Sequence, residues 1–263
     1  MAQEDKKGQE LVPFGDWKPS APGLAAQGLD AVRRNLVAAE MGVNSLALAS
    51  GVKMIRVPSG PFIMGTNEQH LDEREDEKPR RTVTLNTYCL SKTPITVGQF
   101  RAYTRASDGR FDWDGRKPRW GWRDDHPMVR VTWHEAKAYC SWAGGDLPTE
   151  AQWERAARGT DGQKYPWGNE WNPDMCVHNS ETLKRSRTEP VNRRANIFVT
   201  DLGHTDMAGN VSEWCLEHNQ YGDCILRGSS WNQHLLSSFR SSYRSAADPR
   251  FEMSIVGFRL AGI

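Results

Sequence analysis

The sequence predicts an α+β fold that is rich in loops and has a helical extension at its N-terminus. Three helix starts, each opened by a threonine, are the first observation, and short stretches of β character before them are the second. The third is the composition, with 11 Trp, 23 Gly and 14 Pro in 263 residues. Many tryptophans beside many glycines and prolines indicate that large rings, rather than long regular elements, pack the irregular part of the chain.

The charge and hydropathy of the chain argue against two classes of partner. Lys and Arg number 34 and Asp and Glu 33, so the chain lacks the basic excess that nucleic-acid-binding proteins show. The mean hydropathy is −0.70, and no apolar run approaches the roughly 18 to 20 residues that cross a bilayer. The N-terminus lacks the apolar run of a secretory signal. We expect a cytoplasmic protein with no nucleic-acid and no membrane partner.

Residues 1–50 are predicted to form an extended arm and one amphipathic helix. Residues 1–22 hold prolines, glycines and charges, and offer little that can form a core. Between residues 24 and 41, apolar side chains recur at helical spacing, at Leu29, Val32, Leu36 and Val37. The apolar face of this helix either docks on the rest of the chain or recruits a protein partner.

The main domain is predicted to span residues 51–263 and to open with strands. Met54–Val57 and Phe62–Met64 flank a Ser-Gly pair in the manner of a β-hairpin. Farther on, apolar and polar residues alternate as they do in a half-buried strand, with one face formed by Val83, Leu85 and Thr87.

Three helices are predicted from capping boxes, in which a threonine side chain accepts from the N3 amide while the N3 side chain reaches back to the cap. The pairs are Thr96 with Gln99, Thr132 with Glu135, and Thr149 with Gln152. The third helix is predicted to end at Gly159, where a left-handed C-terminal cap fits. Beyond Gly159 we find no regular period over about 100 residues, only short β-like stretches between Gly, Asn, Pro and Trp, and we expect loop-dominated structure there.

The cysteines and histidines lack the spacing of a disulfide framework or a metal knuckle. Five cysteines, an odd number, include no Cys-x-x-Cys pair, so we interpret them as reduced, small apolar fillers. The seven histidines show no His-x-x-x-His spacing, and His134 is expected to face solvent in the first turn of its helix. Arg240, Arg244 and Arg259 are interpreted as structural partners of loop carbonyls and carboxylates.

Eight motifs, which occur in one order from about residue 53 to the C-terminus, carry a family resemblance. They are Val57–Gly65, Leu90–Thr96, Val131–Trp133, Leu147–Glu154, Tyr165–Asn169, Met207–Trp214, Leu226–Trp231 and Val256–Arg259. Together they resemble the formylglycine-generating enzyme, or sulfatase-modifying factor, family. The resemblance implies a variant of the C-type lectin fold for residues 51–263, and it does not extend to residues 1–50.

The resemblance also implies a copper chemistry that this sequence does not support. Active members of the family bind copper through two cysteines after a Gly-Ser-aromatic turn, because two soft thiolates suit Cu(I). Those positions align with Gln233 and Ser238, a carboxamide and a hydroxyl. We expect no copper and no formylglycine generation by the known chemistry. A family cysteine matches Cys140, but its usual disulfide partner would fall at Leu260, which agrees with a reducing compartment.

A structural calcium ion is a further implication of the resemblance. Its ligands would correspond here to the Asp206 side chain, the carbonyls of Gly209 and Val211, and the Glu213 carboxylate. Oxygen ligands from one tight loop suit this hard cation. The alternative is that Asp206 and Glu213 only accept hydrogen bonds from loop amides.

The chain also resembles the variable proteins of diversity-generating retroelements, a non-catalytic use of this fold. In those proteins the segment between the Gly-Ser-Trp turn and the terminal Gly-Phe-Arg is a mutable ligand-binding surface. We therefore predict a binding module that contacts a protein or other ligand through segment 232–254. The predicted contacts are Asn232, His234, Leu235, Leu236, Ser237, Phe239, Ser241, Tyr243, Asp248, Phe251 and Ser254. Ordinary core packing would also explain Phe239, Tyr243 and Leu235.

Two other functions stay open at the level of the sequence. One is an oxidative maturation enzyme that works without the cysteine pair on a peptide or phenolic substrate, as the resemblance to pyoverdine-maturation members implies. It would need a polar pocket near Trp231, Gln233, Ser238 and Arg240. The other is a regulatory scaffold that is recruited through the N-terminal helix. A deep polar pocket would favour the enzyme, and a flat surface dotted with aromatic side chains would favour the binding module.

Overall fold

The computed structural model describes residues 45–47, 51–67, 75–107, 110–180 and 186–262. The predicted extended arm and the predicted helix over residues 24–41 lie outside the described residues. Strand β1, Ser45–Ala47, precedes the predicted domain boundary at residue 51 and pairs antiparallel with β2, Lys53–Val57.

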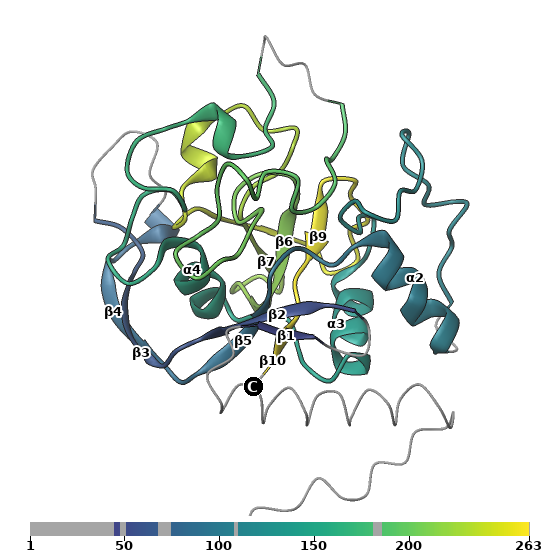
Figure 1. Cartoon of the computed structure of the whole chain (residues 1–263), viewed down its shortest axis with the longest axis horizontal. Coiled ribbons are helices and arrows are strands. Elements are labelled where there is room, and N and C mark those ends of the chain that lie inside the picture. The colour runs from purple at the N-terminus through teal and green to yellow at the C-terminus, as the bar shows by residue number, and fades with distance from the viewer. Residues whose placement is uncertain (1–44, 48–50, 68–74, 108–109, 181–185, 263) are drawn as a thin grey trace, which may run out of the picture.

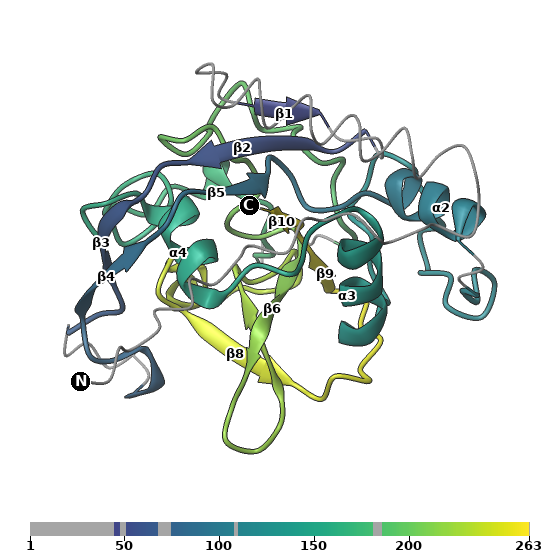
Figure 2. The same cartoon turned by 90° about the horizontal axis from the view of Figure 1, so that it is seen from below.

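Strands from the two ends of the domain form one four-stranded sheet in the order β1-β2-β5-β10. β5, Tyr88–Ser91, is buried along its whole length and pairs with β2 on one edge and with β10, Ala261–Gly262, on the other. The pairing of Ala261 with Leu90 places the end of the chain beside its first strands, as Figure 2 shows. The two ends of the domain are therefore fixed to each other.

The predicted hairpin of Met54–Val57 with Phe62–Met64 is wrong, because the two strands belong to different sheets. β3, Gly60–Met64, pairs with β4, Arg81–Leu85, in a separate two-stranded sheet that is followed along the chain by β5. The 3-10 helix η1, Glu75–Glu77, lies between β3 and β4. The Ser-Gly pair correctly indicates a turn. A local turn signal does not determine which distant strand pairs with β2.

The three predicted helices are confirmed, and all three capping boxes form. They are α2, Val97–Ala106, α3, Trp133–Trp142, and α4, Glu150–Arg158. α4 ends at Gly159 as predicted, but the predicted left-handed cap is wrong, because this glycine has a φ of 72° with a ψ of −153°. α3 and α4 lie on either side of β6 and β10 (Figures 1 and 2). Within the described ranges, no helix combines the length and the apolar character needed to cross a membrane.

The β-like stretches expected after Gly159 include a second four-stranded sheet, whose strand bounds and pairing the sequence did not reveal. Its order is β8-β7-β6-β9, and β6 and β9 are parallel. Its strands are β6, Ser212–His218, β7, Cys224–Arg227, β8, Arg244–Ala247, and β9, Val256–Phe258. Two 3-10 helices, η2, Pro173–Met175, and η3, Leu236–Phe239, lie in the loops. β7 and β9 are buried along their whole length, so they lack the alternation that marks a half-buried strand.

Tryptophan side chains tie this second sheet to the helices. The indole N–H of Trp133 on α3 donates to the Cys215 carbonyl at 2.8 Å, and that of Trp214 on β6 donates to the Val131 carbonyl at 3.1 Å. Trp153 on α4 donates to the Glu213 carboxylate at 2.8 Å. All three rings are buried. Each therefore fills core volume and satisfies its polar atom across the interface.

Candidate functional site

Segment 232–254 lies between β7 and β9 along the chain and includes η3 and the edge strand β8. A fully buried ion pair holds the sheet to which β8 belongs. Glu213 on β6 and Arg259, which follows β9, are both 0% exposed. The Arg259 Nε lies 2.8 and 3.0 Å from the two Glu213 carboxylate oxygens. Its Nη1 donates to the carbonyls of Ser91 and Lys92, at 3.1 and 2.9 Å. This one guanidinium therefore links the two four-stranded sheets.

Further arginine–carboxylate pairs lie around α4 and the start of the segment. Arg227 on β7 pairs with Glu154 on α4, which also accepts from Arg158 at 2.7 Å. Arg244 binds Glu150 through two hydrogen bonds, at 2.5 and 2.9 Å. Arg240 donates to Glu77 at 2.9 Å. The structural interpretation of Arg240, Arg244 and Arg259 is confirmed, because each guanidinium is bound to a carboxylate.

The four predicted calcium ligands lie in and after a tight turn, and the oxygens of Asp206, Gly209 and Glu213 accept hydrogen bonds from the protein. The Asp206 carboxylate accepts from the Asn192 amide at 2.9 Å and from the Asn210 side chain at 3.3 Å. The Gly209 carbonyl accepts from the Val211 amide at 2.9 Å. Gly209 has a φ of 74°, and a Cβ there would lie 2.2 Å from the Val177 carbonyl oxygen, so the turn requires glycine.

These contacts resemble a closed hydrogen-bond network more than an open donor set for a metal. The Arg259 guanidinium supplies the positive charge next to Glu213. Burial raises the pKa of both Glu213 and Asp206, and the positive charge of Arg259 opposes that rise. In the part of the chain that the structure describes, no three His, Cys, Asp or Glu side chains are grouped as a metal site. The calcium ion stays a prediction, which chelation can test.

Both positions that align with the copper-binding cysteines take part in hydrogen bonds within the protein. The Ser238 hydroxyl donates to the Leu235 carbonyl at 2.6 Å and is 3% exposed. The Gln233 carbonyl accepts from the Asn179 amide at 2.8 Å. All five cysteines are buried free thiols, and burial raises the pKa of Cys140 and Cys215 well above its usual value. Such thiols are poor nucleophiles and poor metal ligands.

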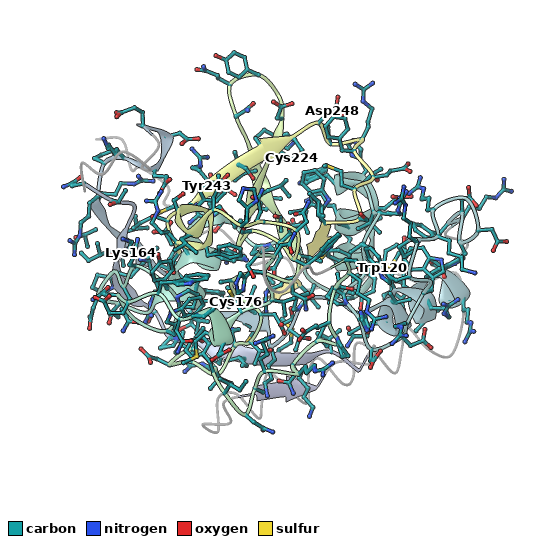
Figure 3. The ribbon with its side chains drawn as sticks, turned by 90° about the horizontal axis from the view of Figure 1, so that it is seen from above. Trp120, Lys164, Cys176, Cys224, Tyr243 and Asp248 are labelled. Carbon is teal, nitrogen blue, oxygen red and sulfur yellow. The ribbon has the colours of Figure 1, made fainter. Side chains whose placement is uncertain are left out.

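The predicted contact residues of segment 232–254 divide into exposed, half-buried and buried groups. The exposed ones are Asn232, His234, Leu235, Leu236 and Phe251. The half-buried ones are Ser237, Tyr243, Asp248 and Ser254, and Figure 3 shows Tyr243 and Asp248 at the two ends of β8.

Two of the predicted contact residues are wrong, because their side chains lie inside the protein. Phe239 is 1% exposed and packs in a cluster with Tyr165, Cys176 and Ala208. Ser241 is also 1% exposed, its amide donates to the Lys164 carbonyl, and its carbonyl accepts from Arg227. Neither can contact a ligand from its place in the fold. Core packing, the alternative to ligand contact, is therefore the correct interpretation for Phe239 and not for Leu235.

The structure adds two residues to this surface that the sequence prediction missed. Met253 is exposed beside Phe251 in the loop before β9. Trp120 lies edge-to-face on Trp231, with ring centroids 5.6 Å apart. The Trp231 indole N–H donates to the Ser254 carbonyl at 3.1 Å and so joins the two ends of the segment. No sequence signal identifies Trp120, because it comes from a loop more than a hundred residues earlier in the chain.

The chain matches the family model of the sulfatase-modifying factor enzyme 1-like domain over residues 42–262. The chain belongs to this family. Inactive C-alpha-formylglycine-generating enzyme 2 of Bos taurus is 32% identical to it over 242 residues, which cover 71% of this chain and 79% of that protein. A formylglycine-generating enzyme of Thermomonospora curvata is 31% identical over 217 residues, which cover 62% and 71%. Family members similar to this chain thus include one named a formylglycine-generating enzyme and one named an inactive enzyme.

Two solved structures show the same fold. PvdO from Pseudomonas aeruginosa superposes with a TM-score of 0.69 at 25% identity, covering 81% of this chain and 95% of that chain. Treponema denticola variable protein 1 superposes with a TM-score of 0.63 at 20% identity, covering 80% and 95%. The mixed helix and strand fold of the sulfatase-modifying factor family, expected from the sequence motifs, is thereby confirmed.

Proposed function

We propose that this member of the sulfatase-modifying factor family is a binding module that contacts a protein or other ligand through segment 232–254. The observation that carries the proposal is the exposure of large apolar side chains there. Leu235 is 57% exposed, Leu236 46%, Phe251 52% and Met253 39%. The other large apolar side chains that are exposed among the described residues are three, namely Ile197, Val199 and Tyr221. A concentration of exposed apolar side chains marks an interaction site.

Backbone hydrogen bonds hold the loops that bear these side chains. The Arg130 amide donates to the Met253 carbonyl at 3.0 Å, and the Asn179 amide donates to the Gln233 carbonyl at 2.8 Å. The bond from Trp231 to Ser254 joins the loop before η3 to the loop before β9. A surface fixed in this way loses little conformational entropy when a partner binds.

The residues at the copper positions favour binding over oxidation. Gln233 and Ser238 offer a carboxamide and a hydroxyl, which are poor ligands for Cu(I). The oxidative alternative would need a substrate pocket near Arg240. The pocket that Arg240 lines with Lys164 and Ser242 holds about 40 Å³, which suits a few water molecules and not a peptide. The name of the bovine relative, an inactive enzyme, supports the same choice.

A selection experiment tests the proposal. Peptides displayed on phage and selected on the full chain should yield binders that need the apolar side chains of segment 232–254. Their affinity should fall by at least about tenfold in Leu235→Ser/Phe251→Ser, the loss typical of two central contacts. The matched control is Ile197→Ser/Tyr221→Ser, which removes two other exposed large side chains, 54% and 80% exposed, outside the segment. Binders that depend on the control residues, or on neither pair, would contradict the proposal.

A finer proposal is that segment 232–254 is diversified. Its exposed positions carry His, Leu, Asn and Phe, side chains that can be exchanged without loss of a buried contact. The observation that tests this is the genomic neighbourhood of the coding sequence. A near-copy of the segment beside a reverse transcriptase would support diversification, and a locus without either would contradict it. The scaffold alternative depends on residues 1–50 and stays a prediction.

A further inference from the structure

A second concave site lies between α2 and α3, outside segment 232–254. These helices lie side by side in Figures 1 and 2. The pocket has a volume of about 180 Å³ and is partly open to solvent. Its lining includes Phe100, Tyr103 and Phe111, which come from α2 and the loop that follows it. A cavity of about 150 Å³ with an apolar lining is enough to bind benzene, so this pocket has room for one aromatic ring.

Three aromatic side chains line this pocket, and one of them, Phe100, contacts the other two edge-to-face. Phe100 lies edge-to-face with Tyr103 and with Phe111, at centroid distances of 5.4 and 5.2 Å. Phe100 is 1% exposed and is part of the main core, whereas Tyr103 and Phe111 are half-buried. An additional aromatic ring that packs offset or edge-to-face on these rings gains binding energy beyond that of the apolar area it buries. A planar aromatic ring therefore suits this pocket better than an aliphatic chain of the same volume.

The charges around the pocket leave one positive group without a carboxylate. Glu135, which lines the pocket, accepts from Arg116 at 2.7 Å and from the Thr132 cap at 2.8 Å. Arg116 also forms an ion pair with Glu252, with 2.7 Å between its Nη2 and the Glu252 Oε1. Arg110 also lines the pocket, is exposed, and pairs with no carboxylate among the described residues. Arg116 is thus occupied by two carboxylates, and Arg110 is the guanidinium at this pocket that is open to an anionic ligand.

We propose that the pocket between α2 and α3 is a binding site for a small single-ring aromatic carboxylate. The ring lies against Phe100, Tyr103 and Phe111, and the carboxylate points to Arg110 at the opening. Ala138 on α3 lines the same space and is exposed, so the helix presents no bulky side chain there. This site is separate from the proposed contact surface, and either can exist without the other.

The experiment is a titration of the full chain with 4-fluorobenzoate, followed by ¹⁹F NMR. Saturable binding in the millimolar range is expected, with weaker binding of fluorobenzene and of 4-fluorobenzylamine. Ala138→Leu fills the pocket and should abolish binding of all three probes. Arg110→Gln should weaken 4-fluorobenzoate about fivefold, as expected for one solvent-exposed arginine–carboxylate pair, and should leave fluorobenzene unchanged.

Two matched variants on α2 serve as controls, since neither residue lines the pocket. Ala102→Leu adds the same side chain as Ala138→Leu at another exposed helical alanine, and Arg105→Gln removes another exposed arginine. Both should bind 4-fluorobenzoate as the unmodified chain does. The absence of saturable binding, its persistence in Ala138→Leu, or equal binding of the amine would each overturn the proposal. A fivefold loss in Arg105→Gln as well would show a diffuse charge effect and would also overturn it.

Discussion

Segment 232–254 and the sheet that holds it differ in the burial of their side chains. In the sheet, Glu213 and Arg259 are 0% exposed and bind each other and the surrounding backbone. In the segment, Leu235 and Phe251 are 57% and 52% exposed. The buried charges hold the backbone of the sheet, whereas the side chains of Leu235 and Phe251 lie largely in solvent. Such side chains can change, or bind a partner, at little cost to the fold.

The largest expected effect on stability comes from removing one partner of the buried ion pair. Arg259→Met leaves the Glu213 carboxylate buried without its cation, and we expect a loss of about 3–5 kcal/mol in the free energy of unfolding. Urea unfolding, followed by tryptophan fluorescence, measures it. The double variant Glu213→Gln/Arg259→Met removes both charges and should recover much of the loss. A loss below about 1 kcal/mol in the single variant would show that the ion pair does not hold the sheet.

The same unfolding assay tests the predicted calcium ligands around Glu213. If the Asp206 and Glu213 carboxylates bind calcium together with the carbonyls of Gly209 and Val211, chelation must lower the unfolding midpoint, because an ion that binds only the folded state stabilises it. Added calcium should then restore the midpoint. A midpoint that responds to neither EDTA nor calcium would contradict the predicted site.

A second pair of variants compares two apolar residues of the segment itself. Phe239 is buried against Tyr165 and Cys176, so Phe239→Ala should cost about 3 kcal/mol of unfolding free energy through the cavity that it leaves. Leu235 is exposed only four residues earlier, and Leu235→Ala should change stability by less than about 0.5 kcal/mol. The two midpoints are measured in parallel by urea unfolding. Equal effects would contradict the division of the segment into core and surface.

The smallest expected effect is a pH dependence of the free energy of unfolding, which arises from a buried histidine. His126 is buried, its Nδ1 lies 2.8 Å from the Thr188 hydroxyl, and burial lowers its pKa despite the nearby carboxylate of Asp125. Below about pH 6.5, the unfolded chain therefore takes up a proton that the folded chain does not. Stability should fall on acidification, by at most about 1.4 kcal/mol per pH unit for this one group.

The variant His126→Asn isolates that contribution. An amide can keep a hydrogen bond to Thr188 but does not titrate, so its stability should fall less steeply than that of the unmodified chain between pH 7 and 5. The measurement is the difference between the two profiles of unfolding free energy against pH. Parallel profiles would mean that His126 protonates freely in the folded state, and that this part of the interior admits water.

Elements set by short-range contacts were predictable from the sequence, and elements set by long-range contacts were not. The capping boxes at Thr96, Thr132 and Thr149 each lie within four residues, and all three form. The pairing of β2 with β5 instead of β3 depends on segments more than thirty residues apart. The burial of Phe239 and the contact of Trp120 with Trp231 depend on such distant neighbours as well.

By itself, the sequence determined the helix starts, the family, and the chemistry that is available at the copper positions, because a residue type and its near neighbours decide these. Only the tertiary structure decided which side chains of segment 232–254 face solvent, and that Glu213 and Arg259 meet as a buried ion pair. It also created the pocket between α2 and α3. The physical reason is that burial and pairing arise between segments far apart in the chain, where no local preference of a residue fixes its partner.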